Sequence, residues 1–456
     1  MLSRYHFIYG TILLMKIAIL GYAGQGKSAF EYWNKQENDI TICDSNANTP
    51  VPSGIASKLG DDYLADLDEF DLLIRTPALH PRAIQAANPN SPNILDKVWT
   101  NTNEFLKVCP TRNIIGVTGT KGKGTTSTLI THILDNAGFR VHLGGNIGIP
   151  PLDMLANAIQ PDDWVMLELA NFQLIDLESS PHIATCLMIE AEHLNWHNNI
   201  DEYIEAKRQL FVNQSETDIA VYYAENNYSK AIAGASAGLM IPYMTEPGAY
   251  VTEQPDGTEQ IVIDGQYICD VSQIQLLGRH NLQNICAAIT TVWNITQDIS
   301  SIRQTVTSFQ GLPHRLEEVR TVNNVTYYND SFSSAPGATI AAINAVPGSK
   351  IIIIGGVDKN LDLNELARNI LQHKDEIHKV ILIGQVKHKL EQALQSHGFD
   401  NYDVLAETTM SEIVNHTKNI ARPGDSVILS PGTSSFDMFK NFEDRGNKFR
   451  DAVNAL

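Results

Sequence analysis

The stretch Ile114-Ile-Gly-Val-Thr-Gly-Thr-Lys-Gly-Lys-Gly-Thr-Thr126 decides how the rest of the sequence is interpreted. It joins a short apolar run, predicted to be a strand, to the helical pattern Thr128-Leu-Ile-Thr-His-Ile-Leu134. Glycines in such a loop let backbone N–H groups close around phosphate oxygens, and the N-terminus of the following helix attracts negative charge. We therefore predict a nucleotide site, and its loop residues are Gly119, Thr120, Lys121, Gly122, Lys123, Gly124, Thr125 and Thr126.

Side chains of this loop carry more specific predictions. Lys123 would reach the β- and γ-phosphates, and the hydroxyl of Thr125 or Thr126 would contact Mg²⁺. The spacing departs from the strict phosphate-loop string G-x-x-x-x-G-K-[ST], because Gly124 follows the lysine. A flexible strand-to-helix turn that binds nothing is the alternative.

A second glycine-rich loop, Gly21-Tyr-Ala-Gly-Gln-Gly-Lys-Ser28, does satisfy the strict string. Asp44 follows Gly24 by 20 residues (44 − 24) and ends the next predicted strand, where dinucleotide-binding folds hold a ribose. The candidate substrate-binding residues here are Gly21, Gly24, Gly26 and Asp44. The string is equally compatible with ATP, with NAD and with a tight turn that carries a surface lysine.

The apolar pattern predicts the fold class. Short β-branched runs alternate with longer amphipathic stretches, which is typical of parallel sheets covered by helices on both faces. A length of 456 residues allows three domains at about 150 residues each. We predict three consecutive α/β domains with mostly parallel sheets: a Rossmann-like domain over 1–108, a nucleotide-binding domain of the phosphate-loop ATPase type over 109–311, and a Rossmann-like domain over 312–456.

Composition and charge narrow the function. The chain has 33 basic and 52 acidic residues, so its formal net charge is −19, which disfavours nucleic-acid and membrane-surface partners. The five cysteines contain no C-x-x-C pair, and the apolar run 7–23 is interrupted by Lys16 and leads into a glycine loop rather than a cleavage site. We expect a cytoplasmic protein that acts on small molecules. The sequence is silent on oligomeric state and compatible with a monomer.

Six segments in order resemble the Mur ligase family, the amide-forming ligases of peptidoglycan precursor synthesis. Several resemble the branch that adds glutamate to UDP-N-acetylmuramoyl-L-alanine. The segments are Gly119–Thr125; Gly144-Gly-Asn-Ile-Gly148; Glu168-Leu-Ala-Asn-Phe-Gln-Leu174; Glu192-His193 with Tyr203-Ile-Glu-Ala-Lys207; Gly278-Arg-His-Asn-Leu-Gln-Asn284 with Leu312-Pro-His-Arg315; and Leu429-Ser-Pro-Gly-Thr-Ser-Ser-Phe-Asp437 with Phe439, Phe442 and Arg445-Gly446. The first predicted domain matches by the place of its loop only.

The resemblance implies ATP-dependent addition of glutamate, with D-glutamate the first choice, through an acyl phosphate. Residues 1–108 would bind the UDP moiety, 109–311 ATP, and 312–456 the amino acid. Two Mg²⁺ ions are implied, and Lys207 would be carbamylated, which turns a cation into an anion. The implied catalytic residues are Lys123, Glu168, His193, Lys207 and Arg315, and the implied metal ligands are Thr125, Glu168, His193 and Lys207.

Each of these residues also has a plainer interpretation. Glu168 can be a solvated carboxylate at a strand end, His193 an ordinary polar residue, and Lys207 an exposed lysine of an amphipathic helix. Asn281 and Asn284 share a helix face and could bracket adenine or cap the helix.

The junction between the second and third predicted domains leaves similar alternatives open. Arg315 could neutralise phosphate or form a hinge salt bridge, and Asp330 could hold ribose or a Mg²⁺-linked water. Asn146 could hold the metal or the substrate amide, or simply form a turn.

One departure from the glutamate-adding branch concerns the amino-acid site. After Asp330 that branch commonly reads SKATN, whereas this chain has Ser331-Phe-Ser-Ser334, so Phe332 stands at the lysine position. The candidate amino-acid contacts are Ser334, Lys359, Ser435, Phe436 and Phe442. The choice between D- and L-glutamate stays open, because it depends on sub-ångström placement.

Three other functions compete. A folylpolyglutamate synthase is a related ligase whose ATP loop tolerates glycine after the lysine, although the segment ending at Asp437 argues against it. A partner-dependent or non-catalytic protein could retain the nucleotide fold. A dehydrogenase using the first glycine loop has nothing downstream to supply hydride chemistry.

Overall fold

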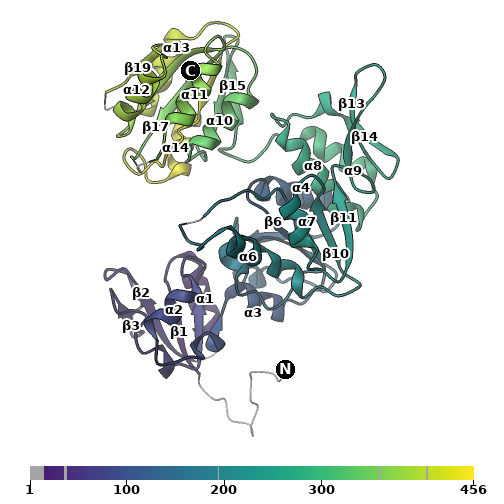
Figure 1. Ribbon diagram of the computed structural model, residues 1–456, viewed down its shortest axis with the longest axis vertical. Helices are drawn as coiled ribbons and strands as arrows, with labels where there is room; N and C mark the ends of the chain where they lie inside the picture. The colour runs from purple at the N-terminus through teal and green to yellow at the C-terminus, as the bar shows by residue number, and fades with distance from the viewer. Residues whose placement is uncertain (1–14, 35–37, 194, 359–360, 407–408) are drawn as a thin grey trace. The chain divides into compact units, whose positions relative to one another are not determined.

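The computed structural model describes residues 15–34, 38–193, 195–358, 361–406 and 409–456. The chain divides into two compact units. The first unit comprises Met1–Val271 and Gln283–Val306, and the second comprises Ser272–Leu282 and Thr307–Leu456. Each unit is described by itself, with its elements labelled as in Figure 1.

The first sheet of the first unit is wholly parallel, in the order β3-β2-β1-β4-β5. Side chains of β1 alternate between two apolar clusters: Ile17 and Ile19 face one, and Ala18 and Leu20 face the other. Both faces are therefore covered. The elements are β1 (Lys16–Leu20), α1 (Gly24–Asn34), β2 (Asp39–Asp44), β3 (Ala56–Leu59), β4 (Leu72–Arg75), α2 (Pro81–Ala87), β5 (Val98–Trp99) and α3 (Asn101–Val108).

The second sheet of the first unit is also parallel, in the order β11-β10-β9-β6-β8-β7. Strands β7 and β8 lie on one side of β6, and the later strands β9, β10 and β11 lie on the other. The boundary between β6 and β9 is therefore a topological switch point. The elements are β6 (Ile114–Thr118), α4 (Lys123–Asn136), β7 (Val141–Gly145), β8 (Trp164–Glu168), α5 (Asn171–Leu174), β9 (Ile183–Cys186), α6 (Ile200–Val212), β10 (Ile219–Tyr223), α7 (Asn227–Ala233) and β11 (Leu239–Tyr243).

A small antiparallel sheet, β12-β13-β14, follows, and sequence analysis did not predict it. The Arg303 guanidinium of α9 donates a hydrogen bond to the Ile268 carbonyl of β14 at 2.5 Å, which ties the helix to this sheet. The elements are β12 (Tyr250–Glu253), β13 (Glu259–Ile263), β14 (Gln266–Asp270), α8 (His280–Trp293) and α9 (Ile299–Ser308).

The sheet of the second unit has the order β15-β16-β20-β17-β18-β19 and is parallel except for β15. Along β17, Ile351 and Ile353 face one apolar cluster, whereas Ile352 and Ile354 face the other. The elements are β15 (Glu317–Val322), β16 (Val325–Asn329), α10 (Pro336–Ala345), β17 (Lys350–Gly355), α11 (Asn364–Gln372), β18 (Ile377–Ile383), α12 (Lys387–Ser396), β19 (Tyr402–Val404), α13 (Met410–Ile420), β20 (Ser426–Leu429) and α14 (Phe442–Asn454).

The predicted α/β class with mostly parallel sheets is confirmed. The first two large sheets belong to one compact unit, so the boundary at 108/109 stays a prediction. Among the residues described, no helix combines the length and hydropathy that a membrane crossing requires.

A buried arginine joins the first two sheets. Arg75, at the end of β4, is 1% exposed. Its guanidinium donates to both carboxylate oxygens of Asp176 at 2.7 Å, and to the carbonyls of Phe172 at 2.9 Å and Leu79 at 2.7 Å. A bidentate pair that satisfies this many donors compensates for the cost of burying the charge.

We predict that Arg75→Met destabilises the first unit, because it strands the Asp176 carboxylate at the joint. The expected loss is about 3 kcal/mol in free energy of unfolding. All five tryptophans lie in the first unit (33, 99, 164, 196 and 293), so urea unfolding followed by tryptophan fluorescence reports on this unit. Lys58→Met is the control: it removes the exposed pair with Glu69 and should cost less than about 1 kcal/mol. Equal losses would contradict the role of the joint.

Candidate functional site

The loop after β6 has the geometry of a phosphate-binding loop. Gly122 has φ +85° and directly precedes the first helical residue, Lys123. The Lys123 ammonium donates to the carbonyls of Gly119 at 2.9 Å and Thr120 at 3.0 Å, so the side chain folds back over the loop. A Cβ atom at position 122 would collide with the Asn284 amide of α8, so only glycine fits there.

The glycine loop after β1 is built differently, although its string is the stricter match. Here the helix begins at Gly24, so Lys27 already lies within α1 and is exposed. The hydroxyl of Ser28 is buried and donates to the Asp153 carboxylate at 2.6 Å instead of facing a ligand. A Cβ atom at Gly26 would strike the Gly21 carbonyl, so these glycines serve close helix–strand packing. The loop after β6 therefore has the geometry that suits phosphate better, and its role toward ATP stays a prediction.

Asp44 helps to shape the first glycine loop. Its carboxylate accepts hydrogen bonds from the backbone N–H groups of Tyr22 at 2.7 Å and Asn46 at 2.8 Å. It therefore links the carboxyl ends of β1 and β2, next to the β1/β4 switch point where open α/β sheets bind ligands. The substrate role of Gly21, Gly24, Gly26 and Asp44 stays a prediction.

Glu168, the last residue of β8, presents an unsatisfied oxygen at the carboxyl edge of the second sheet. One carboxylate oxygen accepts from the Asn146 side-chain amide at 2.8 Å, and the Asn146 backbone N–H donates to the Glu168 carbonyl at 2.8 Å. The other, Oε2, is buried and has no hydrogen-bond partner among the described residues. Because an unpaired buried carboxylate oxygen is costly, this atom fits a bound cation.

Lys207 is buried beneath the phosphate loop, not exposed on its helix. Its Nζ lies 2.9 Å from the Gly119 carbonyl and 4.7 Å from the centroid of the Tyr203 ring. Burial, reinforced by the charge of Lys123, holds the pKa of Lys207 well below its ordinary value. This shift moves Lys207 toward the neutral amine, which is the form that reacts with CO₂.

His193 follows β9 in a left-handed conformation, with φ +58°. Its ring meets the Phe172 ring edge at 4.8 Å between centroids, and Nε2 lies 3.7 Å from the Glu192 carboxylate. Burial and the nearby Lys123 and Lys207 lower the pKa of His193, whereas Glu192 opposes that shift. A neutral imidazole is the form that ligates metals.

The first unit thus gathers the predicted residues from four elements at one sheet edge. Glu168 Oε2 and the hydroxyl of Thr125, in the first turn of α4, are oxygen donors of the kind that Mg²⁺ prefers. Lys207 could bind a metal cation only after carbamylation, which converts its side chain to an anion. Thr120 joins α6 to the loop, because its hydroxyl lies 2.8 Å from the Tyr203 hydroxyl.

In the second unit, Asp330 follows β16 and is buried. Its carboxylate accepts from the hydroxyls of Ser333 at 2.5 Å and Ser430 at 2.7 Å and from the Leu316 N–H at 3.2 Å. Burial raises the pKa of Asp330 to about 6 against the effect of these bonds. The carboxylate therefore ties together the loops that precede β15 and follow β16 and β20.

Arg315 is stacked on an aromatic ring. The carbon of its guanidinium lies 3.8 Å from the centroid of Phe332, and the Phe332 ring in turn meets Phe442 edge-on at 5.0 Å. The Phe332 N–H donates to the His314 carbonyl at 2.9 Å, so the same residue also holds the backbone next to Arg315. The residue that departs from SKATN therefore contacts a predicted catalytic side chain.

Comparisons with known proteins address the family directly. The family model described as Mur ligase middle domain matches residues 117–292, and that described as Mur ligase, glutamate ligase domain matches residues 314–432. The chain belongs to the Mur ligase family.

Among the curated Mur ligases, one named UDP-N-acetylmuramoylalanine–D-glutamate ligase from Clostridium tetani is 34% identical, covering 99% of this chain and 98% of the relative. One of the same name from Clostridium kluyveri is 35% identical over 87% of this chain and 86% of its own length. Among solved structures, UDP-N-acetylmuramate-alanine ligase MurC from Thermotoga maritima is similar with a TM-score of 0.60 at 15% identity, covering 97% of this chain and 99% of that one. That likeness supports the three-domain fold.

The remaining predicted residues of this Mur ligase are distributed over both units, and one of them lies outside the described ranges. Ser435 is buried, whereas Ser334 and Phe436 are exposed and Phe442 is half-buried. These four lie on loops or at a helix start near the carboxyl ends of β16 and β20. Lys359 lies outside the described residues. The Asn281 amide donates to the Leu277 carbonyl at 2.8 Å, while Asn284 packs beneath Gly122.

Sequence reasoning missed the part played by Arg445. This side chain is 1% exposed and donates to the Ser331 hydroxyl at 2.9 Å and carbonyl at 2.7 Å. It also reaches the Thr433 carbonyl at 3.3 Å, so it joins the loops that follow β16 and β20. The family resemblance included Arg445-Gly446 in its last segment, but nothing in the sequence predicted that this arginine is buried or what it contacts.

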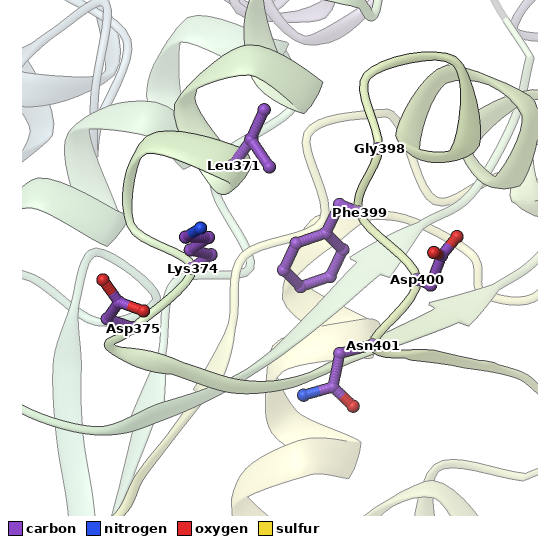
Figure 2. A pocket seen from close by; sticks show the side chains of 7 residues that line it. All are labelled: Leu371, Lys374, Asp375, Gly398, Phe399, Asp400 and Asn401. Atoms are coloured by element: carbon purple, nitrogen blue, oxygen red, sulfur yellow. The ribbon is translucent and has the colours of Figure 1, made fainter.

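A surface depression of ≈ 520 Å³ in the second unit does not coincide with the predicted amino-acid site. Figure 2 shows its lining side chains, which include Lys374, Phe399 and Asn401. They precede β18 and β19, so the depression lies at the amino edge of the sheet. The predicted site lies at the carboxyl edge, where parallel α/β sheets place their ligands.

We predict that Gly122→Ala weakens nucleotide binding and that Gly138→Ala does not. Both glycines have φ near +85°, at +85° and +88°, so both variants suffer the same backbone strain of about 1 kcal/mol. Only at Gly122 would the new methyl group collide, with Asn284. We expect at least a tenfold increase in Kd for a fluorescent ATP analogue, which is about 1.4 kcal/mol. Similar Kd values for the two variants would contradict the packing of Asn284 against the loop.

Proposed function

We propose that this chain is an ATP-dependent ligase that joins D-glutamate to UDP-N-acetylmuramoyl-L-alanine. The observation that carries the proposal is the 34% identity, over 99% of this chain, to a relative whose name specifies D-glutamate. The phosphate loop after β6 and the unsatisfied Glu168 oxygen support it.

The chemistry requires ATP because a carboxylate has no leaving group. A substrate carboxylate oxygen attacks the γ-phosphorus, the bond to the β-phosphate oxygen breaks, and ADP leaves. The glutamate amine then attacks the acyl phosphate, loses a proton, and the tetrahedral intermediate expels phosphate to give the amide.

Residues of the first unit would serve the phosphoryl-transfer step. The Lys123 ammonium and the backbone N–H groups of residues 119–126 would bind the phosphates. Glu168, Thr125, His193 and carbamylated Lys207 would hold two Mg²⁺ ions, which when bound offset phosphate charge. Asn146 would orient Glu168, to which it already donates. Asn284 would support the phosphate loop, and Asn281 would contact the adenine ring.

Residues of the second unit would receive the amino acid. A lysine for one carboxylate, with a serine hydroxyl for the other, would suffice chemically, which is the reason for proposing Lys359 and Ser435. Ser334, Phe436 and Phe442 complete the proposed set. The roles of Arg315 and Asp330 toward the nucleotide rest on the family resemblance alone. We further propose that the reaction takes place in the cytoplasm.

The first test is phosphate release by the purified chain with ATP, Mg²⁺ and UDP-N-acetylmuramoyl-L-alanine, in parallel with D- and L-glutamate. We expect release with D-glutamate alone. Lys123→Met should lower that rate at least about a hundredfold, because it removes a charge that stabilises the transferring phosphate. Release with L-glutamate alone would make this an L-adding ligase, and release only with a reduced folate would replace the proposal with folylpolyglutamate synthesis.

We predict that Lys207 carries a carbamate in the purified protein, because burial and the charge of Lys123 shift its amine toward the neutral, reactive form. After incubation with ¹³C-bicarbonate, ¹³C NMR should show one carbamate signal, and Lys207→Arg should abolish it. Lys350→Arg is the matched control: Lys350 is also 1% exposed, but its ammonium is paired with Glu376 at 2.8 Å. A signal that survives in Lys207→Arg would contradict the assignment.

A further inference from the structure

Glu202, in the first turn of α6, is a point of convergence outside the predicted site. Its Oε2 accepts from the Asn198 N–H at 2.6 Å and from the Arg82 guanidinium at 3.1 Å. The imidazoles of His80 and His197 approach the same carboxylate at 3.4 and 3.5 Å. Residues from the β4–α2 segment of the first sheet thus meet the turn that leads from His193 to α6.

Two histidines and a glutamate at these distances also resemble a metal site, with ligand atoms within 4.8 Å of one another. The hydrogen bonds favour a different interpretation. The Nδ1 of His80 accepts from the Arg82 backbone N–H at 3.1 Å, so in the neutral ring the proton sits on Nε2, which lies 3.4 Å from the Glu202 carboxylate. That carboxylate already accepts from the Asn198 N–H and from the Arg82 guanidinium, so we treat the cluster as a paired carboxylate flanked by two imidazoles.

Arg82 also fixes the turn itself. Its guanidinium donates to the Trp196 carbonyl at 2.5 Å, and the Trp196 indole N–H donates to the Ala78 carbonyl at 3.1 Å. The N–H groups of Trp196 and His197 both donate to the His193 carbonyl at 3.0 Å. The backbone of His193 is thus held by a turn, and Trp196 of that turn is hydrogen-bonded to Arg82 and Ala78 of the segment after β4.

The ring of His193 is supported from the same direction. It lies against Phe172, and the Phe172 ring also contacts Trp196, with 4.8 Å between centroids in both cases. The Phe172 carbonyl accepts from Arg75 at 2.9 Å. The segment from Arg75 to Arg82 therefore supports both sides of the His193 environment.

We propose that Arg82 is a positioning residue for His193, acting through Trp196 and Glu202. The inference rests on the proposed function, because it takes His193 as a metal ligand. The inference also connects the proposed metal site to the carboxyl end of the first sheet, where the substrate is proposed to bind. The connection is Thr76, the residue after Arg75: its hydroxyl donates to the Leu20 carbonyl at 2.7 Å and lies next to Gly21.

The test compares Mn²⁺ binding to the full chain in the presence of ADP, followed by electron paramagnetic resonance. Arg82→Ala should weaken one class of bound Mn²⁺ about tenfold, as loss of a supporting contact typically does. Glu202→Gln, which keeps the size of the side chain, should act in the same direction. Arg140→Ala is the control, because it removes an arginine paired with Asp163 at 3.5 Å ahead of β7, at the opposite edge of the second sheet.

Turnover provides a second readout. Arg82→Ala should raise the Mg²⁺ concentration needed for half-maximal phosphate release, with KM for the UDP-linked substrate unchanged. A raised KM for that substrate with unchanged Mn²⁺ binding would make Arg82 a substrate contact and overturn the inference. Equal Mn²⁺ binding in wild type and both variants would also overturn it. Failure of the wild type to bind Mn²⁺ with ADP would instead count against the proposed function.

Discussion

The carbonyl oxygen of Gly119 accepts hydrogen bonds from two lysine side chains, Lys123 at 2.9 Å and Lys207 at 2.9 Å. Two ammonium groups at one buried acceptor repel each other, and one carbonyl dipole cannot offset two charges. The electrostatic repulsion is relieved only when one of the two lysines is neutral or when an anion binds beside them. This constraint links the proposed carbamate to phosphate binding at the nucleotide loop. A carbamate on Lys207 and a bound phosphate would each reduce the same excess of positive charge.

The parallel sheets explain how residues so distant in sequence meet at this point. Strands β6, β8 and β9 run in one direction, so the loop after β6, the Glu168 carboxylate and the segment that leads to His193 all emerge at one edge. The Thr120 N–H donates to the Met188 carbonyl at 2.9 Å across the switch point and fixes the spacing of two of these segments. Buried β-branched strands thus determine which polar side chains share the site.

Sequence reasoning predicted the strand that leads into the phosphate loop, because a continuous apolar run such as the one that begins at Ile114 leaves little choice of structure. The glycine strings alone did not rank the two loops, because a string does not encode whether the helix begins at Gly24 or at Lys123, and only the family resemblance assigned ATP to the second loop. Without the family resemblance, the sequence pattern predicted an exposed Lys207, because the amphipathicity of a helix does not show which loop packs over it. The Glu202 cluster left no signal at all, since its members are 122 residues apart (202 − 80).

The stacking of Arg315 on Phe332 has a consequence for charge. An aromatic ring holds a guanidinium by its flat face, so the stack itself uses none of the five N–H donors at the edge. A lysine at position 332, the residue that SKATN carries, would instead place a second cation beside the guanidinium. The phenylalanine therefore contacts the face of the guanidinium without adding charge, and it leaves the N–H donors to partners at the edge.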